Sequence, residues 1–341
     1  MKVLYRLEEL PHGFPRPVAT IGNFDGVHLG HQELMRHLLD RARSTGGTPT
    51  IVTFNPHPLQ VLAPNNAPRQ IQTLPQKLAM LASLGIELAV VIPFDLSLAQ
   101  TSARDFAVGI LWEELQLREI YVGPNFAFGH RREGSFSLLK EIGEEKGFVV
   151  GKIPQVQFRG SRVSSTAIRQ ALVSGQVALA RRLLGRPFAL DGVVVHGTAK
   201  GGSIRIPTAN LQTPNELVPR KGVYVTMLTV DGRRHMGVSN IGFRPTVSRT
   251  AESSPSIETH VLDFDEDMYG KETSLEFMLR LRDEHKFPDL SSLVTQIHRD
   301  IARARRYFRW LESVAPSTFE QTASIMKVQG PKSKVQGPRT S

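Results

Sequence analysis

The 341-residue chain contains no cysteine, and this absence excludes disulfide scaffolds, thiolate zinc sites and cysteine nucleophiles. The chain also lacks any apolar run near the roughly 20 residues that span a bilayer. The acidic residues Glu8 and Glu9 come too early for the apolar core of a signal peptide. We therefore expect a cytoplasmic protein with no membrane partner.

Aromatic residues are also few, at 7% of the chain, and they form no stripe interleaved with basic side chains. Single-stranded nucleic acid is usually bound by such stacking aromatics beside positive charge. The formal net charge of +10 still favours an anionic ligand. Part of that charge lies near the C-terminus, at Lys327, Lys332, Lys334 and Arg339. We expect small anionic ligands such as nucleotides and no nucleic-acid partner.

The length allows about two domains, and the pattern of elements changes near residue 187. Before that point, short β-rich runs alternate with helical patterns, which is typical of a parallel sheet covered by helices on both faces. Residues 1–186 are therefore predicted to form an α/β domain. The expected strands are Val18–Ile21, Thr50–Phe54, Leu88–Ile92 and Ile120–Val122, and the expected helices are Gly30–Arg43, one from Ser102 toward Leu117, Ser164–Val173 and Gln176–Leu184.

Residues 187–314 are predicted to form an antiparallel β-barrel followed by a C-terminal helix. Asp231-Gly232 is a strong signal for a hairpin between two of its strands. Residues 315–341 are polar and repeat the run Lys-Val-Gln-Gly-Pro, so we expect a disordered basic tail. The expected strands are Leu190–Val195, Tyr224–Val230, Arg234–Ser239, Ile257–Leu262 and Ser274–Leu281, and the helix spans about Leu290–Phe308.

The most informative segment is a glycine-rich turn that follows the first expected strand and leads into a helix. Its glycines at positions 22, 26 and 30 let the backbone approach a ligand closely, and a helix N-terminus attracts phosphate. His28 and His31 add hydrogen-bond donors at the same end. Two histidines three residues apart could also bind a metal, but no third ligand lies nearby in the sequence. The glycines therefore favour an anion site.

This turn, Gly22-x-Phe24-Asp25-Gly26-x-His28-x-Gly30-His31, resembles the HxGH signature of one bacterial enzyme family. The family is that of the bifunctional riboflavin kinase/FMN adenylyltransferases, and the signature belongs to their adenylyltransferase module. Three later segments agree with that module in order, namely Val52–Pro58, Val122–Gly129 and Arg162–Arg169. The second half resembles the riboflavin kinase module in Pro207–Asn210, Gly237–Thr246, Ile257–Gly270 and Arg280–Phe287. The resemblance covers about residues 15–310 and implies a Rossmann-like nucleotidyltransferase domain followed by a riboflavin kinase barrel.

In the transferase half, the resemblance assigns His28, His31 and Arg162 to catalysis. Asn125 follows an expected strand, at the sheet edge where α/β proteins bind ligands, and two prolines stiffen the loop after Phe54. Without the resemblance, Ser164-Ser165-Thr166 would be an ordinary helix N-cap. The residues implied in ATP or phosphate binding are Gly22, Phe24, Asp25, Gly30, Asn125, Ser165 and Thr166, and those implied in flavin binding are Phe54, Pro56, Pro58 and Phe128.

In the kinase half, a glycine-rich run with one lysine precedes Pro207-Thr208-Ala209-Asn210. Such a loop can fold over phosphates or serve as a plain linker. Thr208 and Asn210 lie two apart in an extended segment and could hold Mg²⁺ through hard oxygen atoms. Glu258 stands at the family's base position, where a carboxylate accepts the proton of the riboflavin hydroxyl. The residues expected to bind phosphate here are Gly197, Lys200, Gly201 and Asn240.

The resemblance implies two reactions that use ATP as co-substrate. The first phosphorylates riboflavin to FMN, and the second transfers AMP to FMN, which yields FAD and pyrophosphate. Riboflavin, FMN and ATP are the expected partners, Mg²⁺ is the expected cofactor, and a monomer or weak homo-oligomer is the expected assembly. Residues 201–206 depart from the family pattern, because Arg205 replaces a glycine and position 202 lacks an arginine. The alternative interpretation is a transferase whose barrel binds flavin with weak or no kinase activity.

Overall fold

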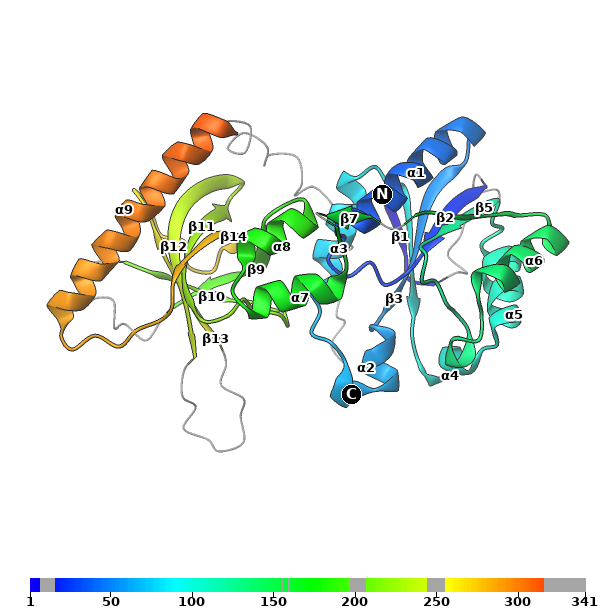
Figure 1. Cartoon of the computed structure of the whole chain (residues 1–341), viewed down its shortest axis with the longest axis horizontal. Helices are drawn as coiled ribbons and strands as arrows, with labels where there is room; N and C mark the ends of the chain where they lie inside the picture. The colour runs from blue at the N-terminus through cyan, green and yellow to red at the C-terminus, as the bar shows by residue number, and fades with distance from the viewer. Residues whose placement is uncertain (7–15, 155, 159, 197–206, 244–254, 316–341) are drawn as a thin grey trace, which may run out of the picture.

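The computed structural model describes residues 1–6, 16–154, 156–158, 160–196, 207–243 and 255–315. A parallel sheet with helices on both faces forms the N-terminal part, and a closed barrel with one long helix forms the C-terminal part (Figure 1). Helices α7 (Ser165–Val173) and α8 (Val177–Leu184) lie between the sheet and the barrel. The α/β and barrel architecture predicted from the sequence is confirmed.

The parallel sheet has the strand order β1-β4-β3-β2-β5-β6. Every residue of β2 is buried, as expected for a central strand with helices on both faces. β2 pairs with β3 on one side and with β5 on the other, so the direction of winding changes beside β2. The strands are β1 (Lys2–Leu4), β2 (Pro17–Ile21), β3 (Thr48–Asn55), β4 (Leu88–Pro93), β5 (Glu119–Val122) and β6 (Val149–Lys152).

Helices cover the two faces of this sheet because alternate strand residues point to opposite sides. Val18 belongs to a buried cluster with α1 and α3, whereas Ala19 belongs to another with η3 and α6. α1 ends at Gly46, whose φ of 63° is typical of a glycine C-cap. The helices of this part are α1 (Leu29–Thr45), α2 (Pro58–Leu62), η2 (Pro64–Asn66), α3 (Leu74–Ser83), α4 (Leu96–Gln100), α5 (Ala103–Asp105), the π-helix η3 (Phe106–Glu114), η4 (His130–Arg132) and α6 (Phe136–Lys146). The two short strands β7 (Gln157–Phe158) and β8 (Ser161–Arg162) precede α7.

The barrel closes in the order β10-β13-β12-β11-β14-β9, with antiparallel pairs throughout. The predicted hairpin at Asp231-Gly232 joins β11 to β12, and both turn residues have positive φ (50° and 74°). The strands are β9 (Phe188–Val195), β10 (Ala209–Gln212), β11 (Gly222–Val230), β12 (Arg233–Phe243), β13 (Pro255–Val261) and β14 (Glu272–Arg282).

Two sets of helices pack on the barrel. Leu172 of α7 shares a buried cluster with Tyr224 of β11, so α7 and α8 connect the barrel to the first domain. On another face, Ala304 and Phe308 of α9 (Leu290–Val314) pack with Val225 of β11. Figure 1 shows α9 on the side of the barrel that faces away from the parallel sheet.

Several local predictions differ from the structure. Ser102 caps a helix as expected, but the helix continues as a π-helix from Phe106. The sequence did not predict this change, because the spacing of apolar residues does not reveal which backbone groups are hydrogen-bonded. The short strands β1, β6 and β10 were not predicted, since three or four residues carry too little periodicity. The expected tail after residue 315 lies outside the described residues. The domain limits near residues 186 and 314 stay predictions.

Candidate active sites

The first candidate site lies at the carboxyl edge of the parallel sheet. The loops after β2 and β5 leave this edge side by side, because β2 and β5 are hydrogen-bonded neighbours. The loop after β2 contains the glycine-rich turn, and the loop after β5 contains Asn125. Open α/β sheets bind ligands at such an edge, where the winding reverses.

His28 and His31 form a stacked pair at the start of α1. Their ring centroids are 3.7 Å apart and their planes differ by 14°. His28 is the N-cap, and its Nδ1 accepts a hydrogen bond from the His31 backbone N–H (3.3 Å). A Cβ at Gly30 would lie 3.1 Å from the His28 ring, so the glycine gives that ring its space. The two imidazoles therefore meet at the positive end of a helix.

Both imidazoles are neutral at pH 7. Burial, with smaller contributions from the charges of Arg162 and Arg186, lowers the pKa of His28 to about 4. Burial, with a contribution from His28, holds the pKa of His31 well below its usual value. Because His28 Nδ1 accepts a hydrogen bond, its ring proton is assigned to Nε2. The histidines can thus donate N–H groups to a phosphate without bearing charge themselves.

We expect the free energy of unfolding to fall as the pH drops from 6.5 toward 4. His28 has a pKa near 4 when folded and 6.5 when unfolded, so the unfolded chain binds more protons in this window. The contribution of His28 to the free energy of unfolding is fully present above pH 6.5. Below that pH, its loss approaches about 1.4 kcal/mol per pH unit. Urea unfolding at pH 7, 6 and 5 measures the slope. His28→Asn should make the slope shallower, with the rest due to His31 and His57, whereas the exposed His298→Asn should leave it unchanged.

Arg162 and Asn125 lie near the histidine pair and contact each other. In the amide orientation that satisfies both groups, the Asn125 oxygen accepts hydrogen bonds from Arg162 Nη2 (2.5 Å) and Nη1 (3.3 Å). Both side chains are exposed, and the charge of Arg162 acts on the His28 ring. Thr166 is exposed on the first turn of α7, which Ser164 caps. The structure therefore brings a guanidinium, an amide and a second helix N-terminus to this edge.

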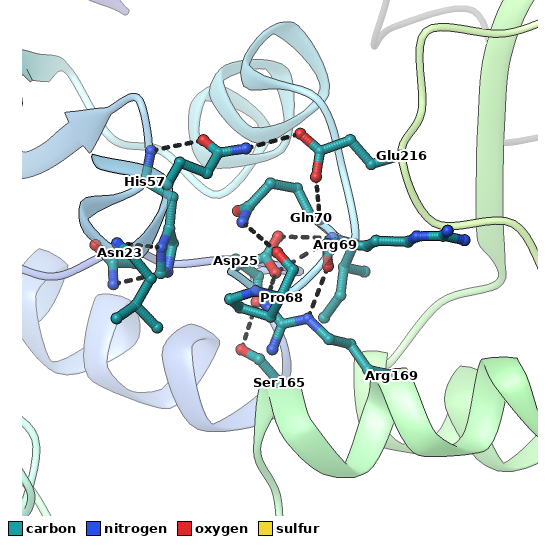
Figure 2. A network of polar contacts seen from close by, with 12 residues as sticks. Asn23, Asp25, His57, Pro68, Arg69, Gln70, Ser165, Arg169 and Glu216 are labelled. Carbon is teal, nitrogen blue, oxygen red and sulfur yellow. Dashed lines mark hydrogen bonds and ion pairs between the residues drawn. The ribbon is translucent and has the colours of Figure 1, made fainter. Parts of the chain in front are cut away.

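Asp25 and Ser165 make contacts within the protein. The buried Asp25 carboxylate accepts a hydrogen bond from Ile71 N–H (3.0 Å) and pairs with Arg169 of α7 (2.5 Å). Burial raises the pKa of Asp25, and Arg169 opposes that rise. Ser165 Oγ donates to the Asp25 carbonyl (2.8 Å). Figure 2 shows these contacts tying α7 to the glycine-rich turn. Direct binding of ATP by either residue stays a prediction.

Gly22 and Phe24 support the turn from inside. The Gly22 N–H donates to Val52 C=O (3.0 Å), which extends the pairing of β2 with β3. Phe24 is buried, and its ring packs edge-on against His31 at 5.3 Å. Phe24 therefore supports the His31 ring, and Gly22 fixes the start of the turn. Contact of either residue with ATP stays a prediction.

Two of the predicted flavin residues, Phe54 and Phe128, belong to an aromatic cluster of the first domain. Phe128 is buried and stacks with Phe126 at 5.1 Å, and both belong to the core under η3. Phe54 is partly buried, and the centroid of its ring lies 6.4 Å from that of Phe106. Pro56 is exposed just after β3, and Pro58 begins α2. Phe54, Pro56 and Pro58 are therefore accessible to a ligand at least in part, whereas Phe128 is buried behind Phe126 in the core.

A small cavity of about 220 Å³ lies where the two domains meet. Phe54, His57 and Lys77 line it from the first domain, and Glu216 lines it from the barrel domain. Glu216 accepts hydrogen bonds from Gln60 Nε2 (3.0 Å) and Gln70 N–H (2.7 Å), as Figure 2 shows. Burial lowers the pKa of Lys77 and lowers that of His57 to about 4. His57 also caps α2 through its side chain.

The second candidate site lies on the barrel, beside α9. Asn210, Glu258 and Asn240 stand in one row across β10, β13 and β12, because each pairs in register with the next. Glu258 Oε1 accepts a hydrogen bond from Ser256 Oγ (3.0 Å). A cavity of about 630 Å³ opens here, large enough for a three-ring ligand. Its lining joins polar and apolar side chains: Thr208, Asn240, Glu258, His260, Glu284, Val223, Val238, Phe287, Leu290, Leu293 and Ile297.

An ion pair forms the base of this cavity. Asp300 of α9 is 1% exposed and accepts hydrogen bonds from Arg282 Nε (2.9 Å) and Gln296 Nε2 (3.0 Å). The pair fixes α9 against β14 and so sets the width of the cavity. Of the other residues predicted for this half, Gly197, Lys200 and Gly201 lie outside the described residues.

Asp300→Ala should destabilise the barrel by about 3 kcal/mol, because it leaves the partly buried charge of Arg282 without its partner. Urea unfolding checks this, with Trp310 of α9 as the fluorescent reporter after Trp112→Phe removes the other tryptophan. Asp263→Ala is the matched control, because it breaks an exposed pair with Arg305 and should cost less than about 1 kcal/mol. Equal losses in the two variants would contradict a structural role for Asp300.

Comparison with known proteins agrees with both sites. Residues 12–167 match the family described as FAD synthetase, and residues 184–308 match the family described as riboflavin kinase. The bifunctional riboflavin kinase/FMN adenylyltransferase of Pseudomonas fluorescens is 39% identical over 84% of this chain and 92% of its own length. The enzyme of the same description from Escherichia coli K12 is 39% identical over 85% of this chain and 92% of its own length.

The chain belongs to the bifunctional riboflavin kinase/FMN adenylyltransferase family. It phosphorylates riboflavin to FMN and transfers AMP from ATP to FMN. A solved structure from Streptococcus pneumoniae, described as a macrolide-efflux protein, has a TM-score of 0.80 and 28% identity over 89% of this chain and 98% of that one. Across the described residues, no helix is both long and apolar enough to cross a bilayer.

Proposed function

We propose that the parallel-sheet domain binds the ATP triphosphate at the start of α1 and transfers AMP there. The observation that supports this most is the stacked pair His28 and His31 at a helix N-terminus, with Arg162 beside it. His31 Nδ1 is buried and has no hydrogen-bond partner within the described part of the chain, so the protein leaves its hydrogen-bonding capacity unused. FMN already carries an anionic phosphate as nucleophile, so this half-reaction needs alignment and charge stabilisation and no general base.

Each group has a separate task in this proposal. The N–H groups of His28 and His31 donate to oxygens of the α-phosphate, where charge grows in the transition state. Arg162 and Asn125 bind the departing pyrophosphate or the incoming FMN phosphate, because a guanidinium binds phosphate oxygens in pairs. Thr166 and the N-terminus of α7 add further donors. The flavin ring lies along the exposed part of the Phe54, Pro56 and Pro58 surface.

In the barrel, we propose that riboflavin occupies the cavity between β11, β12 and α9. Val223, Val238 and Leu293 provide apolar walls for its ring system. Glu258 accepts the proton of the primary alcohol as that oxygen attacks the γ-phosphate of ATP, and the proton passes to its carboxylate. Asn240, in register with Glu258, orients the ligand beside it.

Mg²⁺ is the proposed cofactor. Among the described residues no cluster of three or more His, Asp or Glu could hold a metal by itself. That finding fits magnesium, which usually takes one or two protein oxygens together with substrate phosphates and water. Thr208 and Asn210 provide such oxygens beside Glu258. When bound, the ion would neutralise charge on the transferred phosphate.

Incubation of the pure protein with riboflavin, ATP and Mg²⁺ should produce FMN first and FAD later, with ADP and then pyrophosphate released. Excess EDTA should stop both products, because both steps move charge onto phosphate oxygens. A barrel that only binds flavin would release no ADP with riboflavin as sole acceptor. FAD formation at an unchanged rate in EDTA would contradict the role of the metal.

The remaining expectations concern the setting of the enzyme. We propose that it acts in the cytoplasm, where its co-substrate ATP is abundant. We also propose that it works as a monomer or weak homo-oligomer without nucleic acid.

A further inference from the structure

Arg186 lies between the two domains, in the short link from α8 to β9, and its guanidinium points into the glycine-rich turn. Nη2 donates to the Gly26 carbonyl (2.9 Å) and to Gln72 Oε1 (3.0 Å). Nη1 donates to the carbonyls of Val27 (3.2 Å) and Leu184 (3.3 Å). All four acceptors are neutral. Burial lowers the pKa of Arg186 to about 10, and Glu276 partly opposes this.

The turn that Arg186 contacts is strained. Val27 has a φ of 38°, in a region that β-branched residues rarely occupy, and Gly26 has a φ of 84°. Val27 is fully buried, so the strain must be held by its surroundings. Gln32 Nε2 donates to the same Val27 carbonyl (2.8 Å) and to the Leu184 carbonyl (2.7 Å). The carbonyls before His28 are therefore fixed by donors from both α1 and the interdomain link.

We propose that Arg186 is a positioning residue for adenylyl transfer. It holds the Gly26 and Val27 carbonyls in place and thereby sets the orientation of the next residue, His28, toward the α-phosphate. This inference rests on the proposed role of His28 and extends it. It assigns a function to the link between the domains, since the first residue of the barrel, Phe188, follows only two positions later.

Arg186 also places a positive charge behind the turn. The charged or titratable groups that act on the His28 ring are Arg162 and Arg186, and the His31 ring stacks on it. Of these, Arg162 is exposed and turns toward Asn125, whereas Arg186 is anchored by four hydrogen bonds. The anchored charge favours an anion at the turn and, after burial and Arg162, makes a small contribution to the lowered pKa of His28.

The test compares Arg186→Met, Arg186→Lys and Arg182→Met in the full chain. Arg186→Met should lower kcat for FAD formation from FMN about 100-fold, because small misplacement of a catalytic group has effects of this size. KM for FMN should stay within about threefold, and riboflavin phosphorylation within about twofold. Arg186→Lys keeps the charge but not the planar set of donors, and its kcat for FAD formation should fall about tenfold. Arg182, exposed on α8, is the matched control and should change neither activity.

The titration of His28 by NMR gives a readout that general destabilisation would not move. Loss of the nearby cation in Arg186→Met should raise the pKa of His28, whereas Arg186→Lys should leave it near the wild-type value. Arg186→Met with at least a third of wild-type kcat for FAD formation would overturn the inference. A parallel loss of both activities would overturn it too. If Arg186→Met does not fold, wild-type FAD formation by Arg186→Lys overturns it instead.

Failure of the inference can be told apart from failure of the proposed function. If His28→Asn is inactive in FAD formation while Arg186→Met is active, only the role of Arg186 is lost. If His28→Asn itself forms FAD normally, the proposed transferase site is wrong.

Discussion

His28→Ala and His31→Ala should each slow FAD formation from FMN by about 100- to 1,000-fold, the size of effect seen when one donor to a transition-state oxyanion is removed. In the proposed site, each ring donates an N–H group to the α-phosphate, where charge develops in the transition state. The expected loss is in kcat, since the interaction strengthens as the pyrophosphate leaves. Initial rates of FAD and pyrophosphate release measure it directly.

Two further variants separate chemistry from folding. His28→Asn keeps an oxygen acceptor for the N-cap hydrogen bond to His31 N–H, so α1 should form normally while the imidazole is lost. His37 lies on the same helix, but its ring contacts Tyr121. The His37→Ala variant should therefore retain transferase activity. Riboflavin phosphorylation, measured in the same samples, should stay near wild type. Normal FAD output from both His28→Ala and His31→Ala would refute the assignment.

Glu258→Gln should lower riboflavin phosphorylation by about 100- to 10,000-fold, the range that general-base catalysis contributes. Glutamine keeps the shape of the side chain and can still accept the Ser256 hydrogen bond, but it cannot take the hydroxyl proton. Adenylylation of added FMN should survive, because its site lies in the other domain. ADP release with riboflavin as acceptor, beside FAD formation from FMN, gives both numbers.

A second carboxylate in the same cavity makes this test sharper. Glu284 accepts a hydrogen bond from Asn240 Nδ2 (3.4 Å) and lines the cavity beside Glu258. Glu284→Gln should reduce phosphorylation by less than about tenfold if it contributes only to binding. A large loss in Glu284→Gln with near-normal Glu258→Gln would move the base to Glu284. Loss of both activities in folded Glu258→Gln would defeat the two-site description.

Local sequence patterns predicted the parts of the fold that depend on neighbouring residues. The apolar spacing of Gly30–Arg43 and the stop at Gly46 gave α1 within two residues, and Asp231-Gly232 gave the β11–β12 hairpin. The glycine-rich turn was predicted to be an anion site because its glycines, its histidines and the start of its helix lie within twelve residues. The stacking of His28 on His31 needed the structure, since spacing alone also allowed a metal site.

Contacts between distant segments could not be predicted in this way. Arg186 lies 160 residues from Gly26. The local sequence Gly185-Arg186-Pro187 indicates only the end of a helix. Asp25 likewise meets Arg169 across 144 positions, a contact that no local pattern indicates, and its role in ATP binding stays a prediction. Lys77 and Glu216 carry no local motif, and only packing of the two domains shows that they share a cavity. A charged residue in a plain loop is explained by its partners, which a single sequence does not reveal.

The most direct test is a crystal structure of the protein with Mg²⁺ and α,β-methylene ATP, whose α-phosphate cannot be cleaved from the β-phosphate. We predict that the α-phosphate lies within hydrogen-bond distance of His28 and His31, with the β- and γ-phosphates reaching toward Arg162. Electron density that places the triphosphate away from the first turn of α1, with the two imidazoles still facing solvent or protein, would contradict the central claim.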